Sequence, residues 1–249
     1  FNRFKNINFP KRKILYTNLI QNLRYGENPQ QMGAFYSQSK KNRLEQIHGK
    51  TLSYNNYNDI FAAITISKSL PKNTGTVIVK HGNPCGVSAL KNNLDSYKSA
   101  LESDPISAFG GIVSCNYKVT QKIAVMLNKI FLEVIVANGF DKKALKILKS
   151  KKNLRLIDSS KISFNQVWKF NSFDNFTLIQ SEDKKIFSKK DFRIVSKRQP
   201  SKSQFDNLMF AFNVCRYTKS NAIVLASNKS TIGIGSGQSS RLDSCEIAI

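Results

Sequence analysis

Cysteine and histidine are both scarce in this chain of 249 residues, which has four cysteines and two histidines. The cysteines, Cys85, Cys115, Cys215 and Cys245, are far apart, and no two of them form a C-x-x-C pair. Disulfide frameworks and zinc ribbons are marked by closely and regularly spaced cysteines, so neither is predicted. We therefore expect four reduced thiols that act as small core residues.

Long apolar runs are also missing. No segment approaches the roughly 20 apolar residues that cross a membrane. Residues 1–13, FNRFKNINFPKRK, lack the apolar core and the small-residue cleavage site of a secretory signal. Hydrophobic residues still make up 41% of the chain, enough to bury the core of one large domain or two modest ones. The composition predicts a globular protein in the cytoplasm, without a membrane partner.

Acidic residues are few, 16 against 39 lysines and arginines, and the formal net charge is +23. Such a charge attracts phosphates and invites a nucleic-acid reading. The lysines are nevertheless scattered in short groups, such as 11–13 and 149–152, and no basic stripe alternates with aromatic residues. We expect a solvated Lys-rich surface that attracts small anions, and no dedicated nucleic-acid partner.

Short apolar runs alternate with amphipathic segments between residues 53 and 158, which is typical of βαβ units in a mainly parallel sheet. The runs predict strands at 76–80, 111–115, 134–137 and 154–157, and helices at 94–103, 120–131 and 141–150. An irregular, aromatic stretch at 161–191 predicts a hairpin-like connection. The pattern then resumes with a strand at 192–197, a helix at 202–219 and strands at 222–227 and 232–235. The fold class is therefore α/β.

Ligands of open α/β sheets bind beyond the carboxyl ends of strands, where several unusual residues fall. The first strand runs into Lys80 and His81, followed by a Gly/Pro turn. A neighbouring ammonium favours a neutral imidazole, which can act as a general base. The alternative, a histidine that only forms hydrogen bonds in a turn, remains open.

Glycines at 233, 235 and 237 resemble a nucleotide-binding loop, but their spacing fits neither the dinucleotide nor the P-loop pattern. They predict either a tight turn between strand and helix or backbone amides that approach an anion together with Arg241. A metal site is not expected. His81 and Cys85 resemble part of a zinc deaminase motif, yet Asn83 replaces its glutamate and no second cysteine follows three residues after Cys85.

Nine strings, in this order, resemble the AICAR transformylase domain of the bifunctional purine-biosynthesis enzymes that also carry IMP cyclohydrolase activity. They are LRYGENPQQ (23–31), LSYNNYND (52–59), VIVKHGNPCGV (77–87), SDPISAFGGIV (103–113), FLEVIVANGF (131–140), LKSKKNLRL (148–156), KRQPS (197–201), SNAIVLA (220–226) and GIGSGQSSRLDS (233–244). The resemblance covers nearly everything from about residue 20 onward.

The resemblance implies a cytidine-deaminase-like three-layer α/β fold without a metal, two related subdomains and an intertwined homodimer. Residues 1–22 would be a linker from a cyclohydrolase domain, 23–190 the first subdomain with its connection, and 191–249 the start of an incomplete second subdomain. We accordingly expect a piece of a longer protein. The alternative to an active enzyme is a catalytically inactive fragment that retains only nucleotide or polyanion binding.

The family's reaction transfers a formyl group from 10-formyltetrahydrofolate, the co-substrate, to the 5-amino group of AICAR and gives FAICAR. By resemblance, His81 is the base that assists the amine. Lys80 is the cation that tunes His81 and passes a proton toward the leaving group, and Asn221 holds the formyl oxygen.

Five further residues match family positions that line the AICAR pocket: Arg24, Tyr25, Gly110, Glu133 and Arg241. Arginines suit phosphate and carboxamide oxygens, and a carboxylate suits hydroxyl or amide donors. Ser53, Asn55 and Asn56 would be further neighbours of the pocket.

Two departures from the family pattern stand out. Gln30 takes the place of a histidine near the nucleotide and cannot titrate. Asn138 takes the place of a proline in a turn.

Overall fold

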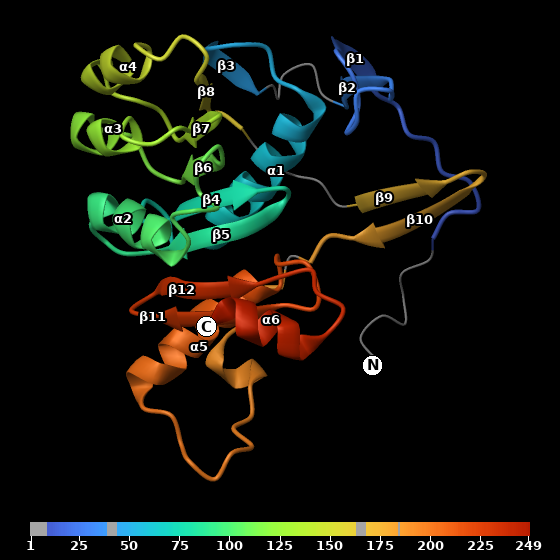
Figure 1. Ribbon diagram of the computed structural model, residues 1–249. Helices are drawn as coiled ribbons and strands as arrows, with labels where there is room; N and C mark the ends of the chain where they lie inside the picture. The colour runs from blue at the N-terminus through green and yellow to red at the C-terminus, as the bar shows by residue number, and fades with distance from the viewer. Residues whose placement is uncertain (1–8, 39–43, 163–167, 184) are drawn as a thin grey trace.

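A computed structural model describes residues 9–38, 44–162, 168–183 and 185–249. Its centre is a sheet of eight strands with helices on both faces, so the fold is a three-layer α/β fold (Figure 1). In sheet order the strands are β11 (Ile223–Ser227), β12 (Ser230–Gly235), β5 (Asn83–Ser88), β4 (Thr76–Lys80), β6 (Ile112–Cys115), β7 (Val134–Ala137), β8 (Arg155–Asp158) and β3 (Glu45–His48).

Six α-helices are described. They are α1 (Tyr54–Ser69), α2 (Asn93–Ser103), α3 (Gln121–Leu127), α4 (Lys142–Leu148), α5 (Lys202–Cys215) and α6 (Arg241–Ala248). One core cluster packs α1 and α5 on one face of the sheet, and the other packs α2, α3 and α4 on the opposite face. In β4, Val77 and Val79 point to the first cluster and Ile78 to the second, because successive strand residues face opposite sides.

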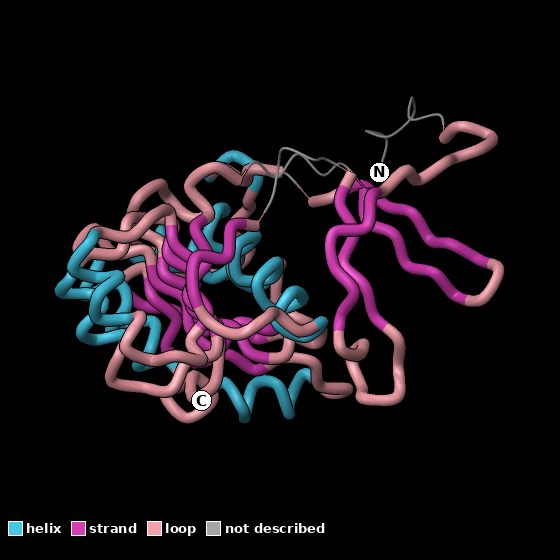
Figure 2. Tube along the Cα trace, turned by 90° about the horizontal axis from the view of Figure 1, so that it is seen from above, coloured by secondary structure: helices cyan, strands magenta, loops and turns pink. Residues whose placement is uncertain are grey.

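Two small antiparallel hairpins lie outside the main sheet. The first pairs β1 (Asn18–Leu23) with β2 (Gly33–Ser37), and the second pairs β9 (Trp168–Phe173) with β10 (Phe176–Ser181). The second confirms the hairpin expected in the aromatic stretch, and it reaches away from the sheet in both views (Figures 1 and 2). A short 3-10 turn, η2 (Lys189–Asp191), follows it.

The expectation of a mainly parallel sheet is wrong. Only the β6–β7 and β7–β8 pairings are parallel; the other five pairings in the eight-stranded sheet are antiparallel. Tight turns produce two of these five antiparallel pairings: the turn at His81 and Gly82 joins β4 to β5, and the turn at Asn228 and Lys229 joins β11 to β12. All four residues have positive φ, the conformation of two-residue hairpin turns. The Gly/Pro string after β4 therefore begins a hairpin, not a crossover.

Other differences concern the ends of elements. The strand expected at 192–197 is absent: these residues have no strand partner among those described, and Val195 is 86% exposed. The helix expected at 120–131 ends at Leu127, and the one at 202–219 ends at Cys215. Helix α1, which the strand and helix pattern did not predict, is held at its start by a capping box between Ser53 and Asn56.

The predicted subdomain boundary near residue 190 falls between β10 and α5, and it stays a prediction. Strands β11 and β12 join the strands of the first half in one sheet through β5. Of the predicted linker, residues 1–8 lie outside the described residues. In the part of the chain that the structure describes, no helix is both long enough and apolar enough to span a membrane.

Candidate functional site

The turn between β4 and β5 carries the two residues singled out for catalysis. Lys80 ends β4, and its Nζ atom donates a hydrogen bond of 2.8 Å to the carbonyl oxygen of Phe109. His81 follows in the left-handed region with φ of 52° and is exposed. The hairpin thus presents an imidazole to solvent and holds the ammonium beside it against the 104–111 loop.

An acidic residue that the motif analysis passed over lies beneath this turn. Asp59 of α1 accepts a hydrogen bond of 2.6 Å from the backbone N–H of Gly82. Burial raises the pKa of the Asp59 carboxyl, and the backbone N–H groups of Gly82 and His81 and the charge of His81 act to lower it. Asp59 is the last residue of the LSYNNYND string, and this position was the only feature of the sequence that could have marked it as a site residue.

Asn83 connects the turn to the segment that leads into Asn221. The Oδ1 atom of Asn83 accepts a hydrogen bond of 3.1 Å from the backbone N–H of Lys219, two residues before Asn221. The Nδ2 atom of Asn221 donates to the carbonyl oxygens of Gln238 and Ser239, at 3.0 and 2.9 Å. A hydrogen bond to a formyl oxygen would have to take the place of one of these two.

Gly110 and Glu133 lie on two segments that backbone hydrogen bonds join to each other. The N–H of Gly110 donates to Phe131 at 2.9 Å, and the N–H of Glu133 donates to Gly111 at 3.1 Å. Gly110 has φ of 74°, a conformation that glycine adopts without strain.

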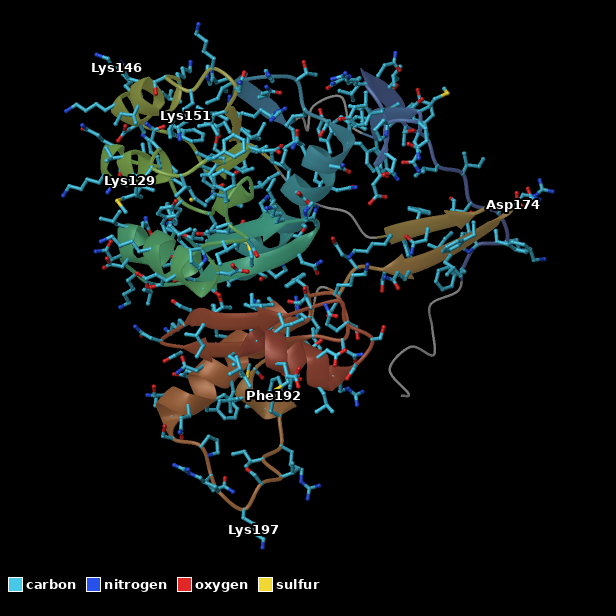
Figure 3. The ribbon with its side chains drawn as sticks, viewed as in Figure 1. Lys129, Lys146, Lys151, Asp174, Phe192 and Lys197 are labelled. Atoms are coloured by element: carbon cyan, nitrogen blue, oxygen red, sulfur yellow. The ribbon has the colours of Figure 1, made fainter. Side chains whose placement is uncertain are left out.

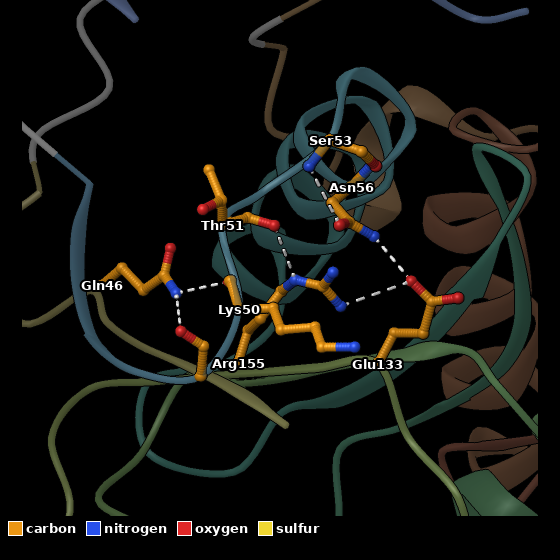
Figure 4. A network of polar contacts seen from close by, with 8 residues as sticks. Gln46, Lys50, Thr51, Ser53, Asn56, Glu133 and Arg155 are labelled. Carbon is orange, nitrogen blue, oxygen red and sulfur yellow. Dashed lines mark hydrogen bonds and ion pairs between the residues drawn. The ribbon is translucent and has the colours of Figure 1, made fainter. Parts of the chain in front are cut away.

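The Glu133 carboxylate is the centre of a polar network (Figure 4). Its Oε2 atom accepts a hydrogen bond of 2.8 Å from Asn56 and lies 3.7 Å from the guanidinium of Arg155. Arg155 also donates to the carbonyl oxygen of Thr51. The contacts described for the carboxylate are all on Oε2, so Oε1 faces none of the described donors.

The N-terminal end of α1 also bonds the loop that follows Arg24 and Tyr25. The side chain of Asn55 donates a hydrogen bond of 3.2 Å to the carbonyl oxygen of Glu27, in the loop after β1. Arg24 is exposed, with its guanidinium 5.7 Å from the ring of Tyr25. The three further neighbours named from the sequence therefore have structural roles here: Ser53 and Asn56 cap α1, and Asn55 fixes the loop.

Arg241 stands apart from these contacts. It is the exposed first residue of α6, and no described contact joins it to the His81 turn. The glycines before it have a packing role, since a Cβ atom at Gly233 or Gly235 would overlap the backbone of Ala248 or Ser244 on α6. The structure thus supports the tight strand-to-helix reading of this string.

The two residues that depart from the family pattern, Asn138 and Gln30, lie in different surroundings. Asn138 donates from Nδ2 to the carbonyl oxygen of Asn116 at 2.9 Å and accepts from Ser159 at 2.9 Å, so it joins the ends of neighbouring strands. Gln30 is exposed between β1 and β2.

A hollow of about 540 Å³ opens beside His81. Its walls come from α1, the turn after β4, the segment after α5 and the β9–β10 hairpin, and they include Phe61, Asn83, Lys169, Tyr217 and Lys219. The described residues contain no group of three or more His, Cys, Asp or Glu side chains that could hold a metal ion.

Comparison with known proteins identifies the family. The family described as AICARFT/IMPCHase bienzyme matches residues 1–249. The chain is 41% identical over 249 residues to the bifunctional purine biosynthesis protein PurH of Acetivibrio thermocellus, covering 97% of this chain and 48% of that protein. It is 43% identical over 235 residues to the PurH of Bacillus cytotoxicus, covering 92% and 46%.

The chain therefore spans about half the length of the relatives it matches. The match to the family extends along the whole chain and includes each string that forms the connected set around His81. This chain belongs to the AICARFT/IMPCHase bienzyme family.

Proposed function

We propose that this chain carries the formyl-transfer part of purine biosynthesis, moving a formyl group from 10-formyltetrahydrofolate to the 5-amino group of AICAR to give FAICAR. The observation that carries the proposal is the connected set around the β4–β5 turn. Asn83 links the turn to the segment before Asn221, and Lys80 links it to the loop of Gly110.

In this proposal His81 carries out the proton transfer that the reaction needs. The AICAR amine is a poor nucleophile, because its lone pair is delocalised into an imidazole that bears a carboxamide. As the amine nitrogen bonds to the formyl carbon, His81 takes the amine proton. The bond between the formyl carbon and N10 of the folate then breaks, and a proton passed through Lys80 restores N10–H.

The nucleotide would lie where the Glu133 network meets the loop after β1. Oε1 of Glu133 is oriented to accept from a hydroxyl or amide, since Asn56 and Arg155 hold Oε2. Arg24 and Arg241 supply guanidinium groups for phosphate or carboxamide oxygens. In this proposal Tyr25 contributes a ring beside Arg24.

Homodimer formation belongs to the same proposal. Large apolar side chains are exposed around the site, including Ile106 at 85% and Phe109 at 60%. Exposed apolar patches mark interaction surfaces in globular proteins. A second copy of the chain that covers them would shield the reaction from water.

Calorimetric titration of AICAR and a formyl-transfer assay test the proposal. His81→Ala should lower turnover by about 10²- to 10⁴-fold, because a general base contributes that much, and should leave AICAR affinity nearly unchanged. Arg241→Ala should weaken AICAR binding instead. Unaltered turnover in His81→Ala, or no saturable AICAR binding by the folded chain, would contradict the proposal.

A second candidate function, polyanion binding without catalysis, is favoured by one surface. Helices α3 and α4 pack together, and the exposed lysines on and around them are Lys118, Lys122, Lys129, Lys142, Lys143, Lys146, Lys149 and Lys152 (Lys129 and Lys146 are labelled in Figure 3). None of the ion pairs described involves them. This function predicts nucleic-acid affinity that falls steeply with salt and is unaffected by His81→Ala.

A further inference from the structure

Asp59 bonds the turn that carries His81, although the two residues lie on different layers of the fold. Asp59 comes from α1, and His81 comes from the turn at the end of β4. The Asp59 carboxylate accepts the backbone N–H of Gly82 at 2.6 Å. One carboxylate on α1 therefore holds the turn directly next to His81.

The turn needs such an anchor. His81 and Gly82 have φ of 52° and 75°, and the left-handed region is unfavourable for a histidine without a compensating contact. The space outside Gly82 is open, with no atom within 4 Å of where a Cβ would lie. The contacts that fix the turn therefore come from its inner side, where Asp59 lies.

The other charged groups near the turn are mostly basic. Lys80 adjoins His81 but donates to Phe109, and Glu133 acts on Asp59 from the neighbouring network. The hollow beside the turn brings Lys169 and Glu182 from the β9–β10 hairpin, and Arg216 and Lys219 from the segment after α5. Asp59 is distinguished from the other acids because it bonds the turn itself.

We infer that Asp59 is the positioning residue of His81: its carboxylate holds the β4–β5 turn and stabilises the imidazolium that forms when His81 accepts a proton. The catalytic part of this inference rests on the proposed function. The pairing follows the general arrangement in which a carboxylate orients a histidine base and compensates its positive charge.

Chemical labelling tests the pairing without any need for turnover. Diethyl pyrocarbonate modifies the neutral imidazole, and mass spectrometry separates the peptides of His48 and His81, the two histidines of the chain. In Asp59→Asn, which keeps an oxygen for the Gly82 N–H, His81 should react about two- to threefold faster at pH 6, as expected for a partly exposed charge pair. At pH 8, where a histidine with an ordinary titration is neutral, the variant and the unchanged protein should react equally.

His48 and a second variant are the controls. His48 should react at the same rate in every protein. Asp174→Asn removes an equal charge from the exposed tip of the β9–β10 hairpin (Figure 3) and should leave the His81 rate unchanged. Should Asp59→Asn fail to fold by circular dichroism, Asp59→Glu keeps the charge and should react like the unchanged protein at both pH values.

Equal rates at pH 6 in Asp59→Asn, or a change of equal size at both pH values, would overturn the inference, because a purely structural effect does not depend on the imidazole charge. A rate for Asp59→Glu that differs at both pH values would do the same. In the formyl-transfer assay, Asp59→Asn should lower kcat about tenfold with KM for AICAR unchanged. Absence of turnover in every protein would contradict the proposed function and leave the labelling result to decide the pairing.

Discussion

Replacing Asp141 should destabilise two helices at once. Its Oδ1 atom accepts the N–H of Ala144 in the first turn of α4, and its Oδ2 atom accepts the N–H of Gln121, the first residue of α3. Thr120, at the N-cap of α3, makes no capping hydrogen bond with its side chain. Asp141 therefore caps the N-terminal end of α3, which the side chain of Thr120 leaves uncapped.

The cost follows from the two bonds. Loss of an N-cap side chain costs about 1 kcal/mol, and loss of a hydrogen bond to a charged group costs about 1.5 kcal/mol. Asp141→Ala should therefore lower the free energy of unfolding by about 2 to 3 kcal/mol. Asp141→Asn keeps one acceptor oxygen and should cost about 1 kcal/mol. Urea unfolding followed by far-ultraviolet circular dichroism measures both.

Asn92→Ala is the matched control. Asn92 caps only α2, through the N–H groups of Leu94 and Asp95. It should cost about 1 kcal/mol. If Asp141→Ala cost no more than Asn92→Ala, the double capping of α3 and α4 would be refuted.

Three further expectations follow from burial and close packing. Gly235→Ala should destabilise the protein by about 2 kcal/mol or more, because its Cβ would overlap the Ser244 carbonyl on α6; an unchanged urea midpoint would contradict this. Ile60→Ala should cost about 2 to 5 kcal/mol, since Ile60 is fully buried against the sheet, and the same unfolding assay checks it. Burial, with a smaller contribution from Asp104, raises the pKa of Cys85 to about 12, so iodoacetamide at pH 8.5 should modify it only after unfolding. Because the pKa of Cys85 in the folded protein lies above its value in the unfolded chain, the contribution of the thiol to stability is complete below about pH 8.5 and is lost as pH rises toward 12. Rapid labelling of Cys85 in the native protein would refute both the slow modification and this pH dependence.

Strands buried on both faces were the most predictable elements. Residues 134–137 are a run of four apolar residues, and β7 occupies those residues with every one of them buried. The strand predicted at 76–80 is likewise confirmed as β4. Such runs are identified from local composition, because a central strand must be apolar on both sides.

Elements that depend on a partner were less predictable. The apolar residues of 192–197 resemble a strand, yet no described neighbour pairs with them. Helix α1 begins with the polar run YNNYND and was missed as an element, although burial of Ile60, Ala63 and Ile64 against the sheet makes it central to the core. Whether a segment pairs or packs is decided by residues far away in the sequence.

The family, the buried strands and the residues at the β4–β5 turn could be read from the amino-acid sequence alone, because ordered motifs and apolar runs are local properties of the chain. The three-dimensional packing settled that this turn reverses the chain, that the sheet is mostly antiparallel and that Asp59 bonds the Gly82 N–H of the turn. Such contacts join residues that are far apart along the chain. Asp59 precedes Gly82 by 23 residues, and their hydrogen bond exists only once α1 packs on the sheet beside β4.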